Sequence, residues 1–208
     1  MDAMKRRTFI RGAVGAAAGA AAASGARGAS AQDKIVVGFM GVGGRGRSLL
    51  QSLVKRNDIE IKYICDADSR AYAAAAEIVV EGHDYKPKFV QDFRRMLEDK
   101  DVDAIVNATS DRWHALATVL ACQAGKDVYV EKPLSLSIWD GRKMIEAARK
   151  YKRVVQVGTQ TRSAPYADKA KEYIASGKLG DVYLVRVYFI QDAPAIQVAP
   201  EAEVPEGL

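Results

Sequence analysis

A glycine-rich hexapeptide constrains this chain more than any other feature of its sequence. Residues 41–46 read Gly-Val-Gly-Gly-Arg-Gly; they follow a β-branched stretch at 34–39 and precede a segment at 45–55 with leucines at helical spacing. A second apolar stretch, at 59–65, is followed directly by Asp66. A G-x-G-x-x-G turn between a strand and a helix, with an acidic residue about 20 positions further on, is typical of a βαβ unit that binds the pyrophosphate of a dinucleotide.

Each part of this turn has an expected role. Gly41 permits the tight turn, Gly43 lets the backbone approach the pyrophosphate, and Gly46 lets the helix pack closely on the strand. The start of the helix offers unpaired N–H groups to the anion. The residues of this unit that we expect to bind the cofactor are Gly41, Gly43, Gly44, Arg45, Gly46 and Asp66.

Asp66 also bears on which dinucleotide is bound. Its carboxylate can accept hydrogen bonds from ribose hydroxyls and would repel a 2′-phosphate, so NAD(H) is preferred. Arg70 keeps NADP(H) possible, because a guanidinium could neutralise that phosphate; it could equally be a solvated residue in the first turn of its helix.

The rest of the body alternates strand and helix patterns. Strands are expected at 34–39, 59–65, 88–90, 104–108, 127–130 and 154–157, and helices at 45–55, 69–80, 93–98, 113–124 and 138–151. Right-handed crossovers then give an α/β fold, a doubly wound parallel sheet of the Rossmann type, over residues 32–160.

The sequence beyond residue 160 changes character. A further helix is expected at 166–176, and a longer alternating strand at 182–190 resembles the first strand of a different sheet. We expect residues 161–190 to be the start of a truncated α+β domain. The Pro-containing segment 191–208 has no periodicity and is expected to be an irregular tail.

The first 31 residues have the three-part pattern of an export signal. Lys5, Arg6, Arg7 and Phe9 precede a weakly apolar run at 12–23, and Ala-Ser-Ala follows at 29–31. This resembles a twin-arginine (Tat) signal peptide, which implies the twin-arginine export machinery as a partner, cleavage after Ala31 and a periplasmic product. Twelve residues of helix span only about 18 Å, which is too short for a transmembrane anchor. No stretch of 18 or more strongly apolar residues follows residue 31, so no membrane span is expected in the mature form.

Charge and cysteine content exclude other classes of function. The formal net charge is +5, of which +4 lies in residues 1–31, so the body lacks the basic surface that nucleic-acid binding requires. Cys65 and Cys122 have no metal-ligand spacing and fall in apolar segments. They are predicted to be buried free thiols, and no metal site is expected.

Four further motifs join the glycine turn. They are Ala-Thr-Ser-Asp-Arg-Trp-His-Ala at 108–115, Glu-Lys-Pro at 131–133, Gly-Thr-Gln-Thr-Arg at 158–162 and Ser-Gly-Lys-Leu-Gly at 176–180. In this order and spacing, from residue 34 to 189, the set resembles the Gfo/Idh/MocA oxidoreductases. Ser110 departs from the pattern, because the family usually has proline there.

The resemblance implies NAD(P)-dependent hydride transfer between nicotinamide and a hydroxyl carbon of a small-molecule sugar, polyol or related compound. Lys132 would be catalytic: it would hydrogen-bond the substrate oxygen and stabilise the developing alkoxide. Glu131 would orient Lys132 or the cofactor. The resemblance places four more residues near the cofactor: Thr109, Trp113, His114 and Gln160. Without it, Trp113 and His114 would be interpreted as a helix cap with a packed indole.

Relatives of this kind carry a second domain with the acid and base that complete proton transfer, and full-length relatives are expected to be homo-oligomers. We therefore expect a truncated chain that binds dinucleotide but turns over slowly or not at all. Two alternatives stay open: an NAD-dependent glycosidase of the same superfamily, and a cofactor-binding remnant without turnover.

Overall fold

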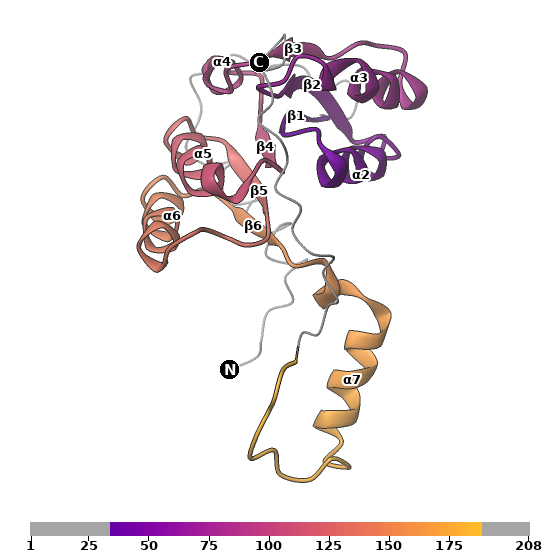
Figure 1. The fold of residues 1–208 in the computed structure, drawn as a ribbon, viewed down its shortest axis with the longest axis vertical. Coiled ribbons are helices and arrows are strands. Elements are labelled where there is room, and N and C mark those ends of the chain that lie inside the picture. Colours follow the sequence, from indigo (N-terminus) through magenta and orange to yellow (C-terminus); the bar gives the residue numbers. More distant parts are fainter. Residues whose placement is uncertain (1–33, 189–208) are drawn as a thin grey trace, which may run out of the picture. The chain divides into compact units, whose positions relative to one another are not determined.

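The structure is a computed structural model that describes residues 34–188 (Figure 1). Its strands are β1 (Ile35–Met40), β2 (Ile59–Cys65), β3 (Lys88–Val90), β4 (Ala104–Asn107), β5 (Asp127–Glu131) and β6 (Val155–Gly158). Its helices are α2 (Gly44–Leu53), α3 (Ala71–Gly82), α4 (Arg94–Glu98), α5 (Asp111–Gln123), α6 (Ile138–Lys150), the 3-10 turn η2 (Gln160–Ser163) and α7 (Pro165–Ala175).

The strands form one parallel sheet in the order β3-β2-β1-β4-β5-β6. This is the order of the doubly wound dinucleotide-binding fold, so the predicted fold class is confirmed. The register aligns the strand ends: Met40 lies opposite both Cys65 and Asn107, and Asn107 lies opposite Val130. The carboxyl ends of the central strands therefore meet at one edge of the sheet, where ligands of such folds bind.

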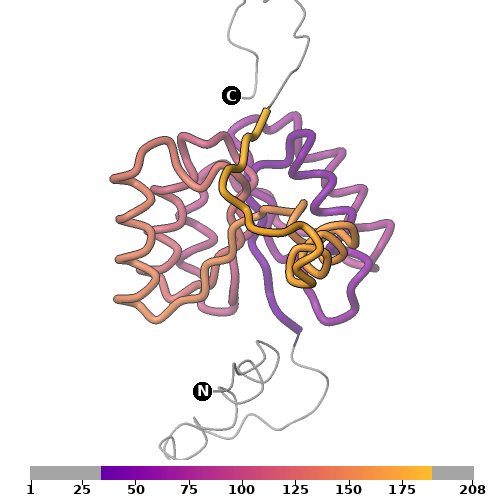
Figure 2. The backbone as a smooth tube through the Cα atoms, turned by 90° about the horizontal axis from the view of Figure 1, so that it is seen from below, coloured from indigo at the N-terminus to yellow at the C-terminus, as the bar shows by residue number. Residues whose placement is uncertain are grey.

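Two layers of helices cover the sheet because alternate residues of each strand point to opposite faces. In β1, Val37 and Phe39 join a core cluster with residues of α2 and α3, such as Leu50 and Val79. Met40 joins a second cluster with residues of α5 and α6. Figure 2 shows α2 and α3 on the opposite side of the domain from α5 and α6.

Cys65 and Cys122 are both buried free thiols, as predicted. Burial raises the pKa of the Cys65 thiol to about 12, with a smaller contribution from Asp66. Within residues 34–188, no helix is long and apolar enough to cross a membrane.

The prediction of a strand at 182–190 is wrong for residues 182–188, the part that the structure describes. Residues 181–188 have no regular secondary structure, and Tyr183 and Val187 are almost fully exposed. The alternation is real, but a strand needs a partner to accept its hydrogen bonds, and no neighbouring strand pairs with residues 181–188. The expected signal peptide, its cleavage site after Ala31 and the tail at 191–208 lie outside the described residues.

Candidate functional site

The glycine turn leaves β1 and enters α2 with little room for side chains. Gly41 has φ +78°, and a Cβ there would lie 2.7 Å from the backbone of Ala108 and Thr109. A Cβ on Gly46 would collide with the carbonyl oxygen of Gly41. These two positions need glycine because Gly41 lies against the backbone that follows β4 and Gly46 lies against the Gly41 carbonyl oxygen.

Gly43 and Gly44 lie in open space. No atom lies within 4 Å of a Cβ built at either residue. The N-cap of α2 is Gly43, which has no side chain to bond the first N–H groups of the helix. These N–H groups are therefore available to an anion. The turn therefore combines a fixed backbone with an open approach to the helix N-terminus.

Asp66 anchors this turn to the end of β2. Its Oδ2 accepts a hydrogen bond from the Val42 N–H at 2.9 Å, and its Oδ1 accepts one from the Asp68 N–H at 3.0 Å. The Gly41 N–H donates to the Cys65 carbonyl at 2.8 Å. The carboxylate is thus fixed beside the glycine turn, where the resemblance to dinucleotide-binding units requires an acid.

Arg70 does not line the pocket beside Asp66. Its guanidinium is paired with Asp68 through bonds of 2.7 and 2.6 Å. The hydrogen bond from Arg70 lowers the pKa of Asp68, so this carboxylate stays charged and holds the guanidinium. Arg70 is therefore already neutralised by its neighbour.

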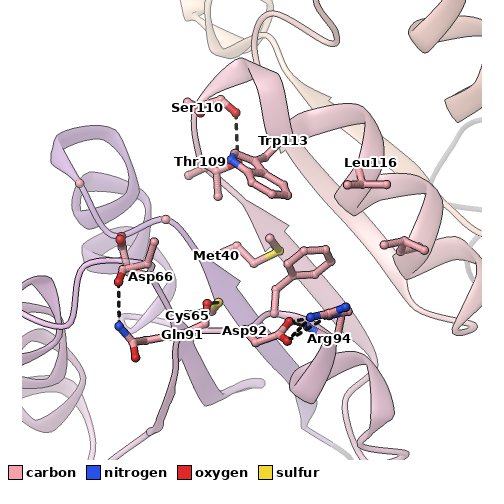
Figure 3. A pocket seen from close by; sticks show the side chains of 16 residues that line it. Met40, Cys65, Asp66, Gln91, Asp92, Arg94, Thr109, Ser110, Trp113 and Leu116 are labelled. Carbon is pink, nitrogen blue, oxygen red and sulfur yellow. Dashed lines mark hydrogen bonds and ion pairs between the residues drawn. The ribbon is translucent and has the colours of Figure 1, made fainter. Parts of the chain in front are cut away.

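A pocket of about 780 Å³ opens at the carboxyl edge of the sheet (Figure 3). Its size lies in the range of small-molecule and cofactor sites. Phe93 and Trp113 meet edge to face at 6.3 Å between ring centroids and form an aromatic wall. Five of the predicted cofactor residues line this pocket, namely Gly41, Gly43, Asp66, Thr109 and Trp113.

Asp92 and Arg94 also line the pocket, although no motif in the sequence pointed to either residue. They pair with each other through several hydrogen bonds, and the bond from Arg94 lowers the pKa of Asp92 to about 2. The signal that could have found them is their position just after β3, since carboxyl ends of parallel strands share one edge.

His114 is buried between two loops of this edge. Its Nδ1 lies 2.6 Å from the carbonyl oxygen of Pro133, and its Nε2 lies 3.2 Å from that of Thr109. The Thr109 hydroxyl donates to the Asn107 side-chain oxygen at 2.7 Å. His114 thus connects the loop after β4 with the loop after β5, and its ring nitrogens face the protein.

Glu131, the last residue of β5, is 4% exposed and accepts three hydrogen bonds. They come from Arg45 Nε at 2.9 Å, the Tyr129 hydroxyl at 3.0 Å and the Lys132 backbone N–H at 3.2 Å. Burial alone would raise the pKa of Glu131, but these bonds outweigh it and the pKa lies below the ordinary value. Glu131 therefore contacts the backbone of Lys132, and its only cationic side-chain partner among residues 34–188 is Arg45.

Lys132 follows directly, and its side chain is exposed at the same edge of the sheet. Gln160 is the first residue of η2 and is also exposed. Neither lines the pocket beside Asp66, and neither do Gly44, Arg45, Gly46, His114 or Glu131. Their expected roles toward cofactor or substrate stay predictions.

Comparison with known proteins finds a match to one family model over residues 35–159. This is the model GFO_IDH_MocA, an oxidoreductase family with an NAD-binding Rossmann fold. Inositol 2-dehydrogenase of Salmonella typhimurium is 33% identical over 151 residues, which are 71% of this chain and 44% of that protein. A glycosyl hydrolase family 109 protein of Stenotrophomonas maltophilia is 32% identical over 146 residues, 67% of this chain and 32% of that protein.

A solved structure shows the same fold. Scyllo-inositol dehydrogenase from Lactobacillus casei, with bound NAD(H) and scyllo-inositol, superposes with a TM-score of 0.64 at 22% identity. The match covers 71% of this chain and 43% of that one. The chain thus spans less than half the length of these similar proteins.

Proposed function

Because the chain belongs to the GFO_IDH_MocA oxidoreductase family with its NAD-binding Rossmann fold, we propose that it is the cofactor-binding part of an NAD-dependent oxidoreductase. The substrate class is a polyol or sugar, and the reaction moves a hydride between a hydroxyl carbon and nicotinamide. Support for this class comes from the similarity to inositol 2-dehydrogenase.

One observation carries the proposal: the glycine turn and the Asp66 carboxylate are hydrogen-bonded to each other at the mouth of a pocket of fitting size. Gly41, Gly43 and the N–H groups that begin α2 would hold the pyrophosphate, and Asp66 would hold the adenosine ribose. The open space at Gly43 fits this group. Bound NAD would supply the hydride acceptor.

Lys132 is the residue of this chain that we assign to the chemistry. It follows β5 at the same edge as the glycine turn, and it is exposed there. A cation that hydrogen-bonds the reacting hydroxyl favours loss of its proton and stabilises negative charge on the oxygen. Glu131 fixes the backbone N–H of Lys132 and so limits where this side chain can begin.

We propose a preference for NAD(H) over NADP(H), which is supported by the charges beside the expected ribose position. The Asp66 carboxylate would repel a 2′-phosphate, and Arg70 is held by Asp68. The test is fluorescence titration of the 208-residue chain with NADH and NADPH. We expect NADH to bind at least about tenfold more tightly, a difference of about 1.4 kcal/mol, because the Asp66 carboxylate would repel the 2′-phosphate of NADPH.

Two substitutions sharpen this test. Asp66→Asn removes the repulsion and should narrow the ratio between the two dissociation constants. Asp68→Asn leaves Asp66 intact but releases Arg70, and should improve NADPH binding alone. Equal or tighter NADPH binding by the unchanged chain would contradict the proposal.

A second candidate is NAD-dependent glycosidase activity, which is favoured by the similarity to glycosyl hydrolase family 109 proteins. The two activities differ in products. Oxidation of a polyol panel accumulates NADH, whereas glycosidase action on aryl glycosides releases the aglycone without net NADH. The product formed, NADH or free aglycone, separates the two activities, and Lys132→Ala serves in both assays as the control for chemistry at this site.

We also propose export by the twin-arginine route, on the pattern of Arg6, Arg7 and Phe9 before a weakly apolar run. Replacing both arginines with lysine should leave the precursor in the cytoplasm. Normal processing and periplasmic recovery of the double variant would refute this assignment.

A further inference from the structure

The carboxylate of Glu131 contacts two parts of the chain that the proposed function assigns to different tasks. Its Oε1 accepts from Arg45 Nε at 2.9 Å, and its Oε2 accepts from the Lys132 N–H at 3.2 Å. Arg45 is the second residue of α2, within the turn that would hold the pyrophosphate. One buried group thus connects Arg45, 86 residues earlier in the sequence than Glu131, to the backbone of Lys132.

The surroundings of Glu131 make this connection stiff. Tyr129 donates a further hydrogen bond to Oε1. A Cβ on Gly158 would lie 2.8 Å from the same oxygen and closer still to the Tyr129 hydroxyl, so β6 packs directly against the pair. A carboxylate with 4% exposure, held from several sides, can shift only if its partners shift with it.

Arg45 is the more exposed member of the ion pair. Its side chain is 40% exposed, whereas that of Glu131 is 5% exposed. A pyrophosphate at the start of α2 would attract the guanidinium and compete with Glu131 for it. Any change in the Arg45 hydrogen bond then alters the charge balance of the carboxylate that fixes the Lys132 backbone.

We infer that Arg45 and Glu131 form a positioning pair that couples dinucleotide binding to the placement of Lys132. This inference rests on the proposed function, since it requires a dinucleotide at the glycine turn. It assigns Arg45 a role beyond phosphate attraction. When the cofactor binds, the change in the Arg45–Glu131 hydrogen bond alters the position of Lys132. By reciprocity, fixing Lys132 also favours cofactor binding.

The experiment measures the reactivity of the Lys132 amine without requiring turnover. The 208-residue chain is acetylated at a low reagent concentration with and without NAD, and the Lys132 peptide is quantified by mass spectrometry against that of the exposed Lys152. In the unchanged chain, saturating NAD should alter the Lys132 rate by about fivefold or more, the lower range of measured site-to-site couplings.

Three variants test the pair, each at NAD concentrations that saturate its own site. In Arg45→Met and Glu131→Gln, the Lys132 rate should no longer respond to NAD. Arg45→Lys keeps the charge but loses the Nε donor, so it should bind NADH while losing the response. Arg47→Met is the matched control: it removes an exposed charge from the same helix turn and should keep the full response.

The outcomes distinguish failure of the proposed coupling from failure of the proposed function. If Arg45 acts only as a cation for phosphate, Glu131→Gln should bind NADH more tightly and keep the Lys132 response, and the inference is wrong. If Arg45→Lys and Glu131→Gln fold by circular dichroism and still respond like the unchanged chain, the inference is also wrong while the proposed function stands. An unchanged chain that binds no NADH overturns both.

Discussion

Asp99 provides a quantitative test of how the fold depends on charge. It follows α4, and its Oδ2 accepts from Lys62 Nζ and from the Tyr63 hydroxyl, each at 2.8 Å, while Oδ1 accepts from the Asp101 N–H at 2.9 Å. The hydrogen bond from Lys62 is the largest cause that lowers the pKa of Asp99 from 3.8 to about 2. Replacing Asp99 with Asn removes this charge and keeps the shape.

The magnitude follows from the pKa difference. Each unit corresponds to 1.36 kcal/mol, so the shift sets an upper limit of about 2.5 kcal/mol. The side chains of Asp99 and Lys62 are 17% and 18% exposed, and solvent screening reduces the expected contribution to about 1–2 kcal/mol. Because the folded pKa lies below the unfolded one, this stability is fully present above the unfolded pKa, near 3.8, and is lost as pH falls toward 2.

Urea unfolding at about pH 7 and about pH 3 measures this effect. Far-UV circular dichroism suits the assay better than fluorescence, since Trp113 and Trp139 are 49% and 67% exposed. Asp99→Asn should be less stable at neutral pH and should lose less stability on acidification. Asp58→Asn, at a surface pair with Arg56, is the control and should match the unchanged chain. Equal losses on acidification in the unchanged chain and Asp99→Asn would refute the reasoning.

Three further predictions concern other parts of the structure. Gly46→Ala should lower NADH affinity by about tenfold or more, because its Cβ meets the Gly41 carbonyl; Ser48→Ala, at an exposed position of the same helix, should bind NADH normally in the same titration. Cys65, whose pKa burial raises to about 12, should resist a thiol reagent until urea unfolds the chain, and rapid labelling of the folded protein would contradict this. Lys126→Met should cost about 2–4 kcal/mol in urea unfolding, since the buried ammonium donates to the carbonyls of Asp99 and Val102 at 2.7 Å each; a loss under about 0.5 kcal/mol would argue against these bonds.

Local pattern was enough to predict the sheet and its helices. Each strand from β1 to β6 lies within two residues of its expected bounds, because apolar runs and helical spacing depend on near neighbours in sequence. The same holds for the glycine turn, since the positive φ of Gly41 and the crowding at Gly46 arise within one βαβ unit. The prediction of a strand at 182–190 failed because a strand needs a partner strand, and the alternation of apolar residues within one segment does not show whether a partner is present.

The contacts of the candidate site were less predictable. Glu131 was expected to orient Lys132 or the cofactor, but its side chain also meets Arg45, 86 residues away, which no local pattern reveals. Asp92 and Arg94 follow a strand of only three residues and belong to no motif. His114 was expected near the cofactor from its motif alone, whereas its buried position depends on the loop that carries the Pro133 carbonyl.

The strand order has a consequence for how this chain acquires its structure. β1 is complete only when β2 covers one of its edges and β4 the other, and the Val36 N–H finds its acceptor, Asp103, 67 residues later. A nascent chain that has emerged only as far as α3 would leave one side of its most apolar strand unpaired. Closing so long a loop costs entropy before any contact is gained. The first half of the domain therefore cannot complete its sheet before β4 is synthesised, and until then the unpaired edge of β1 is a site at which chains can aggregate.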